Sequence, residues 1–188
     1  MYCIRCGAGP MQQRIPPMDN RRRGVCSACG YVHYENPRVV AGCIPVWRRR
    51  VLLCQRAIEP RDGLWTLPAG FMELDETAAQ AAMRETLEEA NARVALDSLF
   101  ALFSLPHVNQ VYLMYRARLL DGSFSPGPES RRVALFREDC VPWEELAFAS
   151  IRYTLELFFR DRGRGAFAVH TGDVLRKGSG YCLVDGQS

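Results

Sequence analysis

The fold of this chain is decided by the stretch GFMELDETAAQAAMRETLEEANA, residues 70–92. Within it, Thr77 and Gln80 stand three positions apart, which is the spacing of a capping box at a helix start. Asn91 stands where a helix end needs a left-handed residue, a conformation that asparagine tolerates. The two signals predict a helix over residues 78–90 that ends at Asn91.

The predicted helix carries three carboxylates on one face. At about 100° per residue, Glu85, Glu88 and Glu89 fall within about 100° of one another. An apolar stripe beside them is expected to pack on a sheet while the acids point away from it; the stripe comprises Ala79, Ala82, Met83, Thr86, Leu87 and Ala90. Like charges at this spacing repel by about 0.2–0.5 kcal/mol per pair. Either a hard divalent cation compensates the acids, or they form a solvated acidic surface.

Strands are predicted on both sides of this helix. Apolar runs indicate a buried hairpin formed by residues 38–47 and 51–56 across a basic turn. Shorter strands are expected within residues 63–70, 99–105, 111–119 and 134–136. Apolar residues at helical spacing predict a closing helix over 143–162, and a Gly-rich tail follows from 163 to 188.

The spacing of the charged residues resembles the Nudix box, G-x5-E-x7-R-E-U-x-E-E-x-G-U, where U is a bulky apolar residue. Gly70 and Glu76 match its start, and residues 84–92 match the rest at every charged position. Asn91 replaces the final glycine, and a threonine and an alanine stand at two of the bulky apolar positions. The resemblance implies an α/β (α+β) fold, the Nudix α/β/α sandwich, in which a mixed sheet lies between helices.

The resemblance also assigns roles to the residues of the box. It implies that Glu85, Glu88 and Glu89 ligate Mg²⁺ or Mn²⁺, with the backbone carbonyl of Ala69 as a further ligand. Arg84 would orient the carboxylates. Metal bound in this way neutralises phosphate charge and lowers the pKa of the water that attacks phosphorus, which makes Glu85 a catalytic residue.

Two more acids complete the expected catalytic set. Glu76 would brace the loop before the helix. Glu129 lies in residues 127–136, a stretch that resembles the place where many family members carry an additional acid. Glu129 is therefore either a metal ligand or general base, or a solvated acid in an ordinary Pro/Gly loop.

The N-terminal segment, residues 1–36, predicts a small metal-held domain. Cys3-x2-Cys6 and Cys26-x2-Cys29 match the two-knuckle pattern of a tetrahedral zinc site, and four thiolates leave no position for a substrate, so a structural Zn²⁺ is favoured over disulfides. The basic run at residues 21–23 can meet phosphate, but no aromatic side chains interleave with it, so we expect a solvated hairpin tip and no nucleic-acid partner.

The substrate is predicted from resemblance at the two ends of the hydrolase domain. Zinc-ribbon Nudix enzymes include the NADH pyrophosphatases, but residues 104–107, SLPH, differ from the S-Q-P-W-P motif that marks NADH specificity. Pro106 lies near the proline position of members that cleave ADP-ribose, and several stretches look most like plant chloroplast-type enzymes that hydrolyse FAD and ADP-ribose. We therefore expect cleavage of FAD or ADP-ribose to two monophosphates.

Aromatic side chains offer candidate contacts for a base or flavin ring. Each is either a core residue or a stacking surface, and Trp65 is retained as a substrate contact beside Pro106. The set comprises Trp47, Trp65, Phe71, Phe103 and Tyr112.

Composition limits the alternatives. A chain of 188 residues, 48% hydrophobic and 24% charged with net charge +3, is typical of a globular protein, and a net charge this small does not by itself indicate a nucleic-acid partner. No run reaches the roughly 18 apolar residues of a membrane span, so we expect a cytoplasmic protein with no membrane partner. The expected domains are a zinc ribbon (1–36), a hydrolase domain (37–162) and a C-terminal tail (163–188). We also expect a homodimer. NADH or other dinucleotides, nucleoside triphosphates and a non-catalytic nucleotide-sensing or RNA-binding module remain the alternatives.

Overall fold

The computed structural model describes residues 1–185 and divides into two compact units between Pro37 and Arg38. The first unit is a three-stranded antiparallel sheet in the order β1-β2-β3, formed by β1 (Gln12–Arg14), β2 (Arg23–Val25) and β3 (Val32–His33). Its buried side chains are few: Cys3, Pro16, Val25 and Cys26. So small a core needs a cross-link or a bound metal to be stable.

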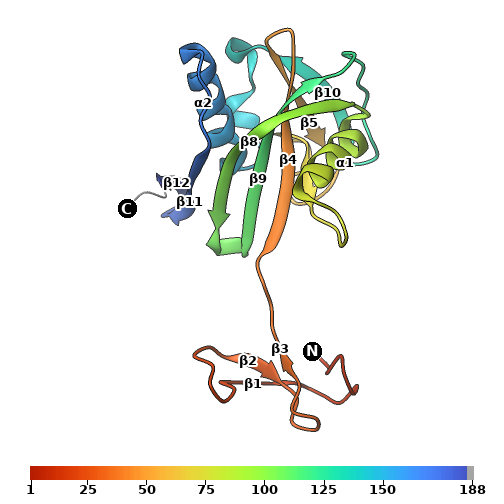
Figure 1. Ribbon diagram of the computed structural model, residues 1–188, viewed down its shortest axis with the longest axis vertical. Coiled ribbons are helices and arrows are strands. Elements are labelled where there is room, and N and C mark those ends of the chain that lie inside the picture. The colour runs from red at the N-terminus through yellow and green to blue at the C-terminus, as the bar shows by residue number, and fades with distance from the viewer. Residues whose placement is uncertain (186–188) are drawn as a thin grey trace. The chain divides into compact units, whose positions relative to one another are not determined.

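The second unit is built on a mixed sheet in the order β10-β5-β4-β9-β8-β11-β12, with β6 paired to β5 and β7 to β4 (Figure 1). Its strands are β4 (Arg38–Trp47), β5 (Arg50–Arg56), β6 (Trp65–Thr66), β7 (Ala69–Phe71), β8 (Val94–Leu105), β9 (Gln110–Leu119), β10 (Ser130–Phe136), β11 (His170–Lys177) and β12 (Gly180–Asp185). Strand β4 runs parallel to β9, and β11 runs parallel to β8, whereas the other pairs are antiparallel. The predicted mixed sheet is confirmed.

Each face of this sheet is covered by one helix, because successive strand residues point to opposite sides. On one side, Ile44 of β4 packs with Leu155 and Phe158 of helix α2 (Ala149–Arg164). On the other side, the neighbouring Cys43 packs with Ala82 of helix α1 (Ala78–Ala90). The predicted sandwich of a sheet between helices is therefore confirmed.

Helix α1 begins and ends where the sequence predicts. The capping box between Thr77 and Gln80 is formed in both directions, and Asn91 adopts the left-handed conformation at φ 46° and ψ 32°. These two caps fix the first and last residues of the acidic helix, and so they fix its position between the loop before it and the turn after it.

The closing helix begins later than predicted. Residues 143–145 form a separate 3₁₀ turn, and α2 starts at Ala149. The backbone between them is extended because Leu146 forms a parallel bridge with Trp65, and the N–H of Ala147 donates to the carbonyl of Trp65 at 2.8 Å. Pairing with a distant strand thus overrides the helical spacing of the apolar residues.

The segment expected as a Gly-rich tail contains the two C-terminal strands. Strand β11 pairs with β8, and β12 completes a hairpin at the edge of the sheet. Burial of Val174, which is 1% exposed, provides the apolar contact that the local composition conceals. The last part of the predicted tail, residues 186–188, lies outside the described residues. Among residues 1–185, no helix is both long and apolar enough to cross a membrane.

Candidate active site

A cavity of about 1200 Å³ opens in the second unit. One wall is acidic and belongs to α1, which contributes Arg84, Glu85, Glu88 and Glu89. Glu129, from the loop before β10, lies on the same cavity. Five of the six charged residues that the sequence singled out, all but Glu76, thus line one cavity, brought together by the helix and by a segment about 40 residues further along the chain.

Arg84 holds three of the carboxylates. Its guanidinium donates to both oxygens of Glu76, at 3.0 and 2.8 Å, and to single oxygens of Glu85 at 2.8 Å and Glu88 at 2.9 Å. A further bond to the carbonyl of Phe71, at 3.1 Å, ties the loop before the helix to this group. The same guanidinium lowers the pKa of Glu76 to about 2. Arg84 therefore orients the acids and fixes the loop.

Two of the acids are buried, contrary to the helical-wheel prediction. Glu85 and Glu89 are only 9% and 7% exposed, whereas Met83 and Leu87, expected in the packing stripe, are 38% and 48% exposed. The buried face of α1 is rotated toward the acids because the small side chains of Ala81 and Ala82 allow close approach to the sheet. The expectation that the acids point away from the packing face is therefore wrong for Glu85 and Glu89, which lie at its border with the cavity.

Burial raises the pKa of both of these acids. It raises the pKa of Glu89 to about 8, with the charge of Glu85 as the next cause. Burial likewise raises the pKa of Glu85, although Arg84 opposes this. Glu129 acts on both residues in the same direction through its charge. Mutual repulsion of carboxylates this close is a cost that a bound cation removes.

Two glycines allow the backbone to approach the acids. A Cβ on Gly70 would collide with the carboxylate of Glu85, and one on Gly127 would collide with the backbone carbonyl of Glu88. The N–H of Gly127 also donates to the carbonyl of Glu89 at 3.0 Å. The loop that carries Glu129 is therefore held against the end of α1, where only a residue without a side chain fits.

The donor set fits a hard divalent cation. Oε2 of Glu89 is buried and has no hydrogen-bond partner, so the site contains an acceptor that a cation would satisfy. Glu85, Glu88 and Glu129 line the same cavity and offer further carboxylate oxygens, which are the ligands that Mg²⁺ and Mn²⁺ prefer. Ala69, the residue predicted to contribute a carbonyl ligand, lines the same cavity.

Two predicted substrate contacts lie elsewhere. Trp65 is only 5% exposed and packs edge-on against Phe136 with ring centroids 4.9 Å apart, so the structure places it in the core. Pro106 begins an exposed 3₁₀ turn, Pro106–Val108, and it is the next two residues, His107 and Val108, that line the cavity.

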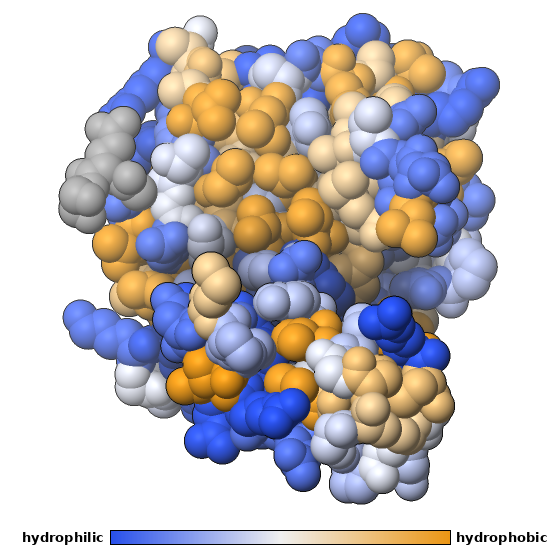
Figure 2. Space-filling model, turned by 60° about the horizontal axis from the view of Figure 1, so that its bottom comes forward, coloured by the Kyte–Doolittle hydropathy of each residue, from blue (hydrophilic) through white to orange (hydrophobic). Residues whose placement is uncertain are grey.

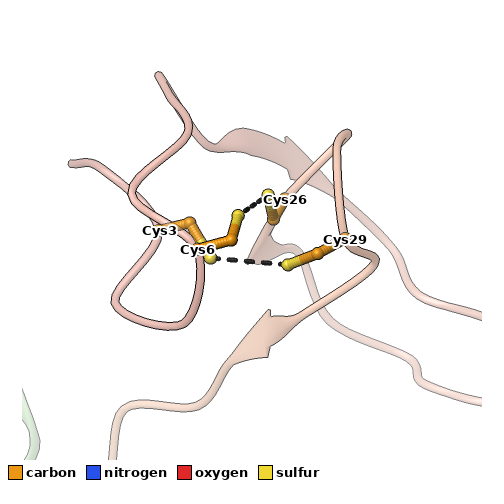
Figure 3. A group of neighbouring side chains, drawn as sticks. All are labelled: Cys3, Cys6, Cys26 and Cys29. Carbon is orange, nitrogen blue, oxygen red and sulfur yellow. Dashed lines mark hydrogen bonds between the residues drawn. The ribbon is translucent and has the colours of Figure 1, made fainter.

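The four N-terminal cysteines converge in the first unit (Figure 3). Their sulfur atoms all lie within 4.8 Å of one another, with 3.6 Å between Cys3 and Cys29 and 3.7 Å between Cys6 and Cys26. A tetrahedron of thiolates about 2.3 Å from a Zn²⁺ has edges of about 3.8 Å, whereas a disulfide requires about 2.05 Å between sulfurs. The arrangement fits a structural Zn²⁺ and not the alternative disulfides.

Comparison with known proteins identifies the family to which this fold belongs. The NUDIX domain model matches residues 36–159, and the Nudix N-terminal model, a zinc ribbon, matches residues 1–35. The chain belongs to the Nudix hydrolase family and carries the N-terminal ribbon of that family.

Three individual proteins illustrate which members of the family the chain resembles. A crystal structure of a NUDIX hydrolase from Nitrosomonas europaea is 50% identical, has a TM-score of 0.90, and covers 93% of this chain and 99% of its own. The NAD-capped RNA hydrolase NudC of Stutzerimonas stutzeri is 29% identical over 86% of this chain, which spans 56% of that relative. An ADP-ribose pyrophosphatase of Methanocaldococcus jannaschii is 28% identical to this chain over an alignment that covers 63% of this chain and 71% of that protein. The likeness to plant chloroplast-type enzymes is not among these findings and remains a prediction.

Two of the predicted aromatic contacts, Phe71 and Tyr112, line the cavity. Sequence reasoning missed other lining residues: Ile58, Phe148, and Val174 and Tyr181 from the C-terminal hairpin. No motif marks these residues, because they come from separate elements that only the folded sheet brings together. The alternation of apolar residues in 170–185 was the available signal, although it is short and interrupted by glycine.

Proposed function

We propose that this Nudix hydrolase cleaves the diphosphate linkage of a nucleoside diphosphate derivative, FAD or ADP-ribose, and releases two monophosphates. The observation that carries the proposal is the combination of an acidic wall with a large apolar remainder in one cavity of about 1200 Å³. Ligand pockets commonly measure about 300–1,000 Å³. A cavity of this size suits a substrate that extends from its diphosphate in two directions.

The residues divide the work as follows. Glu85, Glu88, Glu89 and Glu129 would hold one or more divalent cations, Mg²⁺ or Mn²⁺. The bound cation supplies charge neutralisation of the diphosphate and a water of lowered pKa. Arg84 keeps the carboxylate of Glu85 in place through its 2.8 Å bond.

Two features support the catalytic roles of the remaining predicted acids. Glu76 accepts two bonds from Arg84, so it acts by positioning that guanidinium and the preceding loop. Glu129 is exposed and lines the cavity, where its carboxylate is accessible to a cation or to a water molecule, which suits either a ligand or a general base. In place of Pro106, the next two residues of the same turn, His107 and Val108, are the proposed substrate contacts, and a contact at Trp65 is not supported because that side chain is buried.

The relatives support two substrate classes. One is named an ADP-ribose pyrophosphatase, which agrees with the proposal, and another is named an NAD-capped RNA hydrolase. Residues 104–107, SLPH, lack the motif associated with NADH, so we rank ADP-ribose and FAD above NADH and capped RNA. A homodimer and a cytoplasmic location remain predictions that accompany this proposal.

A substrate panel tests the proposal. Purified protein with Mg²⁺ is incubated with ADP-ribose, FAD, NADH, diadenosine polyphosphates and nucleoside triphosphates, and the products are separated by chromatography. We expect AMP and its partner monophosphate from ADP-ribose or FAD, with kcat/KM at least tenfold above that for triphosphates. Release of pyrophosphate from triphosphates as the fastest reaction would overturn the substrate assignment, and no turnover of any compound would overturn the enzymatic proposal.

A further inference from the structure

The C-terminal hairpin contributes to the cavity although it lies outside the matched NUDIX domain. The domain match ends at residue 159, whereas β11 and β12 follow it, and Val174 and Tyr181 line the cavity. The hairpin is attached by parallel pairing of β11 with β8 and by the hydroxyl of Tyr153, which donates to the carbonyl of Tyr181 at 2.8 Å. The position of Tyr181 is therefore set from two sides.

Tyr181 forms an aromatic pair with His107. The two ring centroids are 5.0 Å apart and the planes are tilted by 39°, and both residues line the cavity. Tyr181 retains 41% exposure, and Val108 in the same turn retains 43%. Aromatic and apolar side chains that are exposed together on a concave surface are typical of ligand-binding sites.

Apolar residues from neighbouring elements line the same cavity as this pair. Leu105 and Val174 are buried core residues on its lining, and Gln110, the first residue of β9, is a polar lining residue that follows the turn. Figure 2 shows apolar side chains gathered over one face of the second unit, in the upper part of the view. The cavity is thus divided between an acidic wall suited to cations and phosphates and an aromatic, apolar wall suited to a flat ring.

We infer that Tyr181 and His107 form the surface on which the heteroaromatic ring of the nucleotide substrate stacks. The inference rests on the proposed function and deepens it, because it assigns the binding of the base to a hairpin that the family match does not include. Every base has a π-face, and stacking needs no hydrogen-bond pattern, so one aromatic pair accepts adenine or a flavin ring. Tyr181 is then a substrate-binding residue whose ring contacts the substrate away from the reacting phosphorus.

The steady-state test compares Tyr181→Ala, Tyr181→Phe and the control Val184→Ala with the unaltered protein. Val184 is a matched control because it lies on the same strand with similar exposure, 40%, and does not line the cavity. For Tyr181→Ala we expect KM for ADP-ribose to rise on the order of tenfold while kcat stays within about twofold, since a lost stacking contact removes binding common to ground and transition states. Tyr181→Phe and Val184→Ala should keep the original KM.

An equilibrium measurement keeps the inference testable without turnover. Binding of AMP to each protein in the absence of divalent cation is followed by calorimetry, with His107→Ala as a second variant in case Tyr181→Ala loosens the hairpin; circular dichroism and melting temperatures check the fold. We expect the Kd for AMP to weaken on the order of tenfold in both alanine variants. Equal AMP affinity and equal KM in folded Tyr181→Ala, His107→Ala and Val184→Ala would overturn the inference. Failure of the unaltered protein to hydrolyse any substrate would instead refute the proposed function, while the AMP measurement still decides the role of Tyr181.

Discussion

Arg84 is the cation around which the acidic residues of the box are arranged. One guanidinium bonds Glu76, Glu85 and Glu88, so it orients acids from both the loop and the helix. Glu89 lies outside this network and keeps a buried oxygen without a partner. Arg84 therefore positions the carboxylates of Glu76, Glu85 and Glu88, whereas Glu89 has an oxygen that is available to bind a metal cation.

Replacing Glu85 by Gln tests the acidic wall directly. The amide keeps the size of the side chain but removes a negative charge and an oxygen donor, so we expect turnover to fall on the order of 10²-fold or more while the melting temperature changes little. Turnover with Mg²⁺ and circular dichroism are the measurements. Glu145→Gln is the control, because this exposed acid in the 3₁₀ turn Trp143–Glu145 does not line the cavity. Near-normal turnover of Glu85→Gln would contradict the metal-site proposal.

Gly70→Ala tests whether the placement of Glu85 matters as much as its charge. The new methyl group would meet the Glu85 carboxylate, which is the far end of a flexible side chain and can swing away. We expect turnover to fall on the order of tenfold or more, because displacement of a catalytic group by about 1 Å costs on the order of 10²-fold, with a small loss of stability. Gly163→Ala is the control, since a methyl group there meets nothing within 4 Å. Equal kinetics in the two variants would show that the fit at Gly70 is unimportant.

Among the structural elements, the end of α1 shows how the fold accommodates Asn91, which stands where the Nudix box has its final glycine. Asn91 takes the left-handed conformation, and its amide donates to the carbonyls of Ser125 and Pro126 at 3.3 and 3.0 Å. The final glycine of the motif would allow the same backbone but not these two bonds. Asparagine thus ends the helix and also fastens the loop that carries Glu129.

Substitutions at Asn91 should separate these two contributions. Asn91→Gly keeps the left-handed backbone and loses the side-chain bonds, so we expect a loss of unfolding free energy of about 1 kcal/mol. Asn91→Ala loses the same bonds and adds the cost of positive φ, roughly 1 kcal/mol more. Urea denaturation gives both values. If Ala were no worse than Gly, the left-handed cap would not contribute to stability.

Hydrogen-bonded pairing between strands far apart in the sequence determined those elements that the local sequence pattern did not predict. The helix over residues 78–90 is predictable because the residues that cap it lie next to it in the sequence. The strands of the main hairpin are predictable because their apolar runs are continuous. The start of α2 was misplaced because Leu146 and Ala147 pair with Trp65. The C-terminal hairpin was missed because its only strong apolar contact, Val174, is supplied by a partner strand far away in the sequence.

At the scale of the whole molecule, the two units have separate sources of stability. The second unit has a sheet with a core on each face, whereas the first has a small core and a cluster of four thiols. Folding free energy in the first unit is therefore expected to come mainly from metal binding.

Removal of zinc tests this separation. After treatment with a zinc chelator and resupply of Mg²⁺, we expect the N-terminal unit to become sensitive to proteases while turnover of the hydrolase unit persists within a few fold. Metal analysis, limited proteolysis and the rate with Mg²⁺ are the measurements. Loss of turnover in a protein whose second unit remains folded would contradict a structural role for the zinc site.

The sequence by itself determined the features that depend on near neighbours: the box with its charged positions, both caps of α1 and the two cysteine pairs. These are recognisable because three- and four-residue spacings decide which groups meet. The folded chain is needed to show that Glu85 and Glu89 are buried at the edge of the packing face, and that Glu129 and Tyr181 line the same cavity. Those outcomes depend on how a mixed sheet brings distant strands together, and no local spacing encodes that pairing.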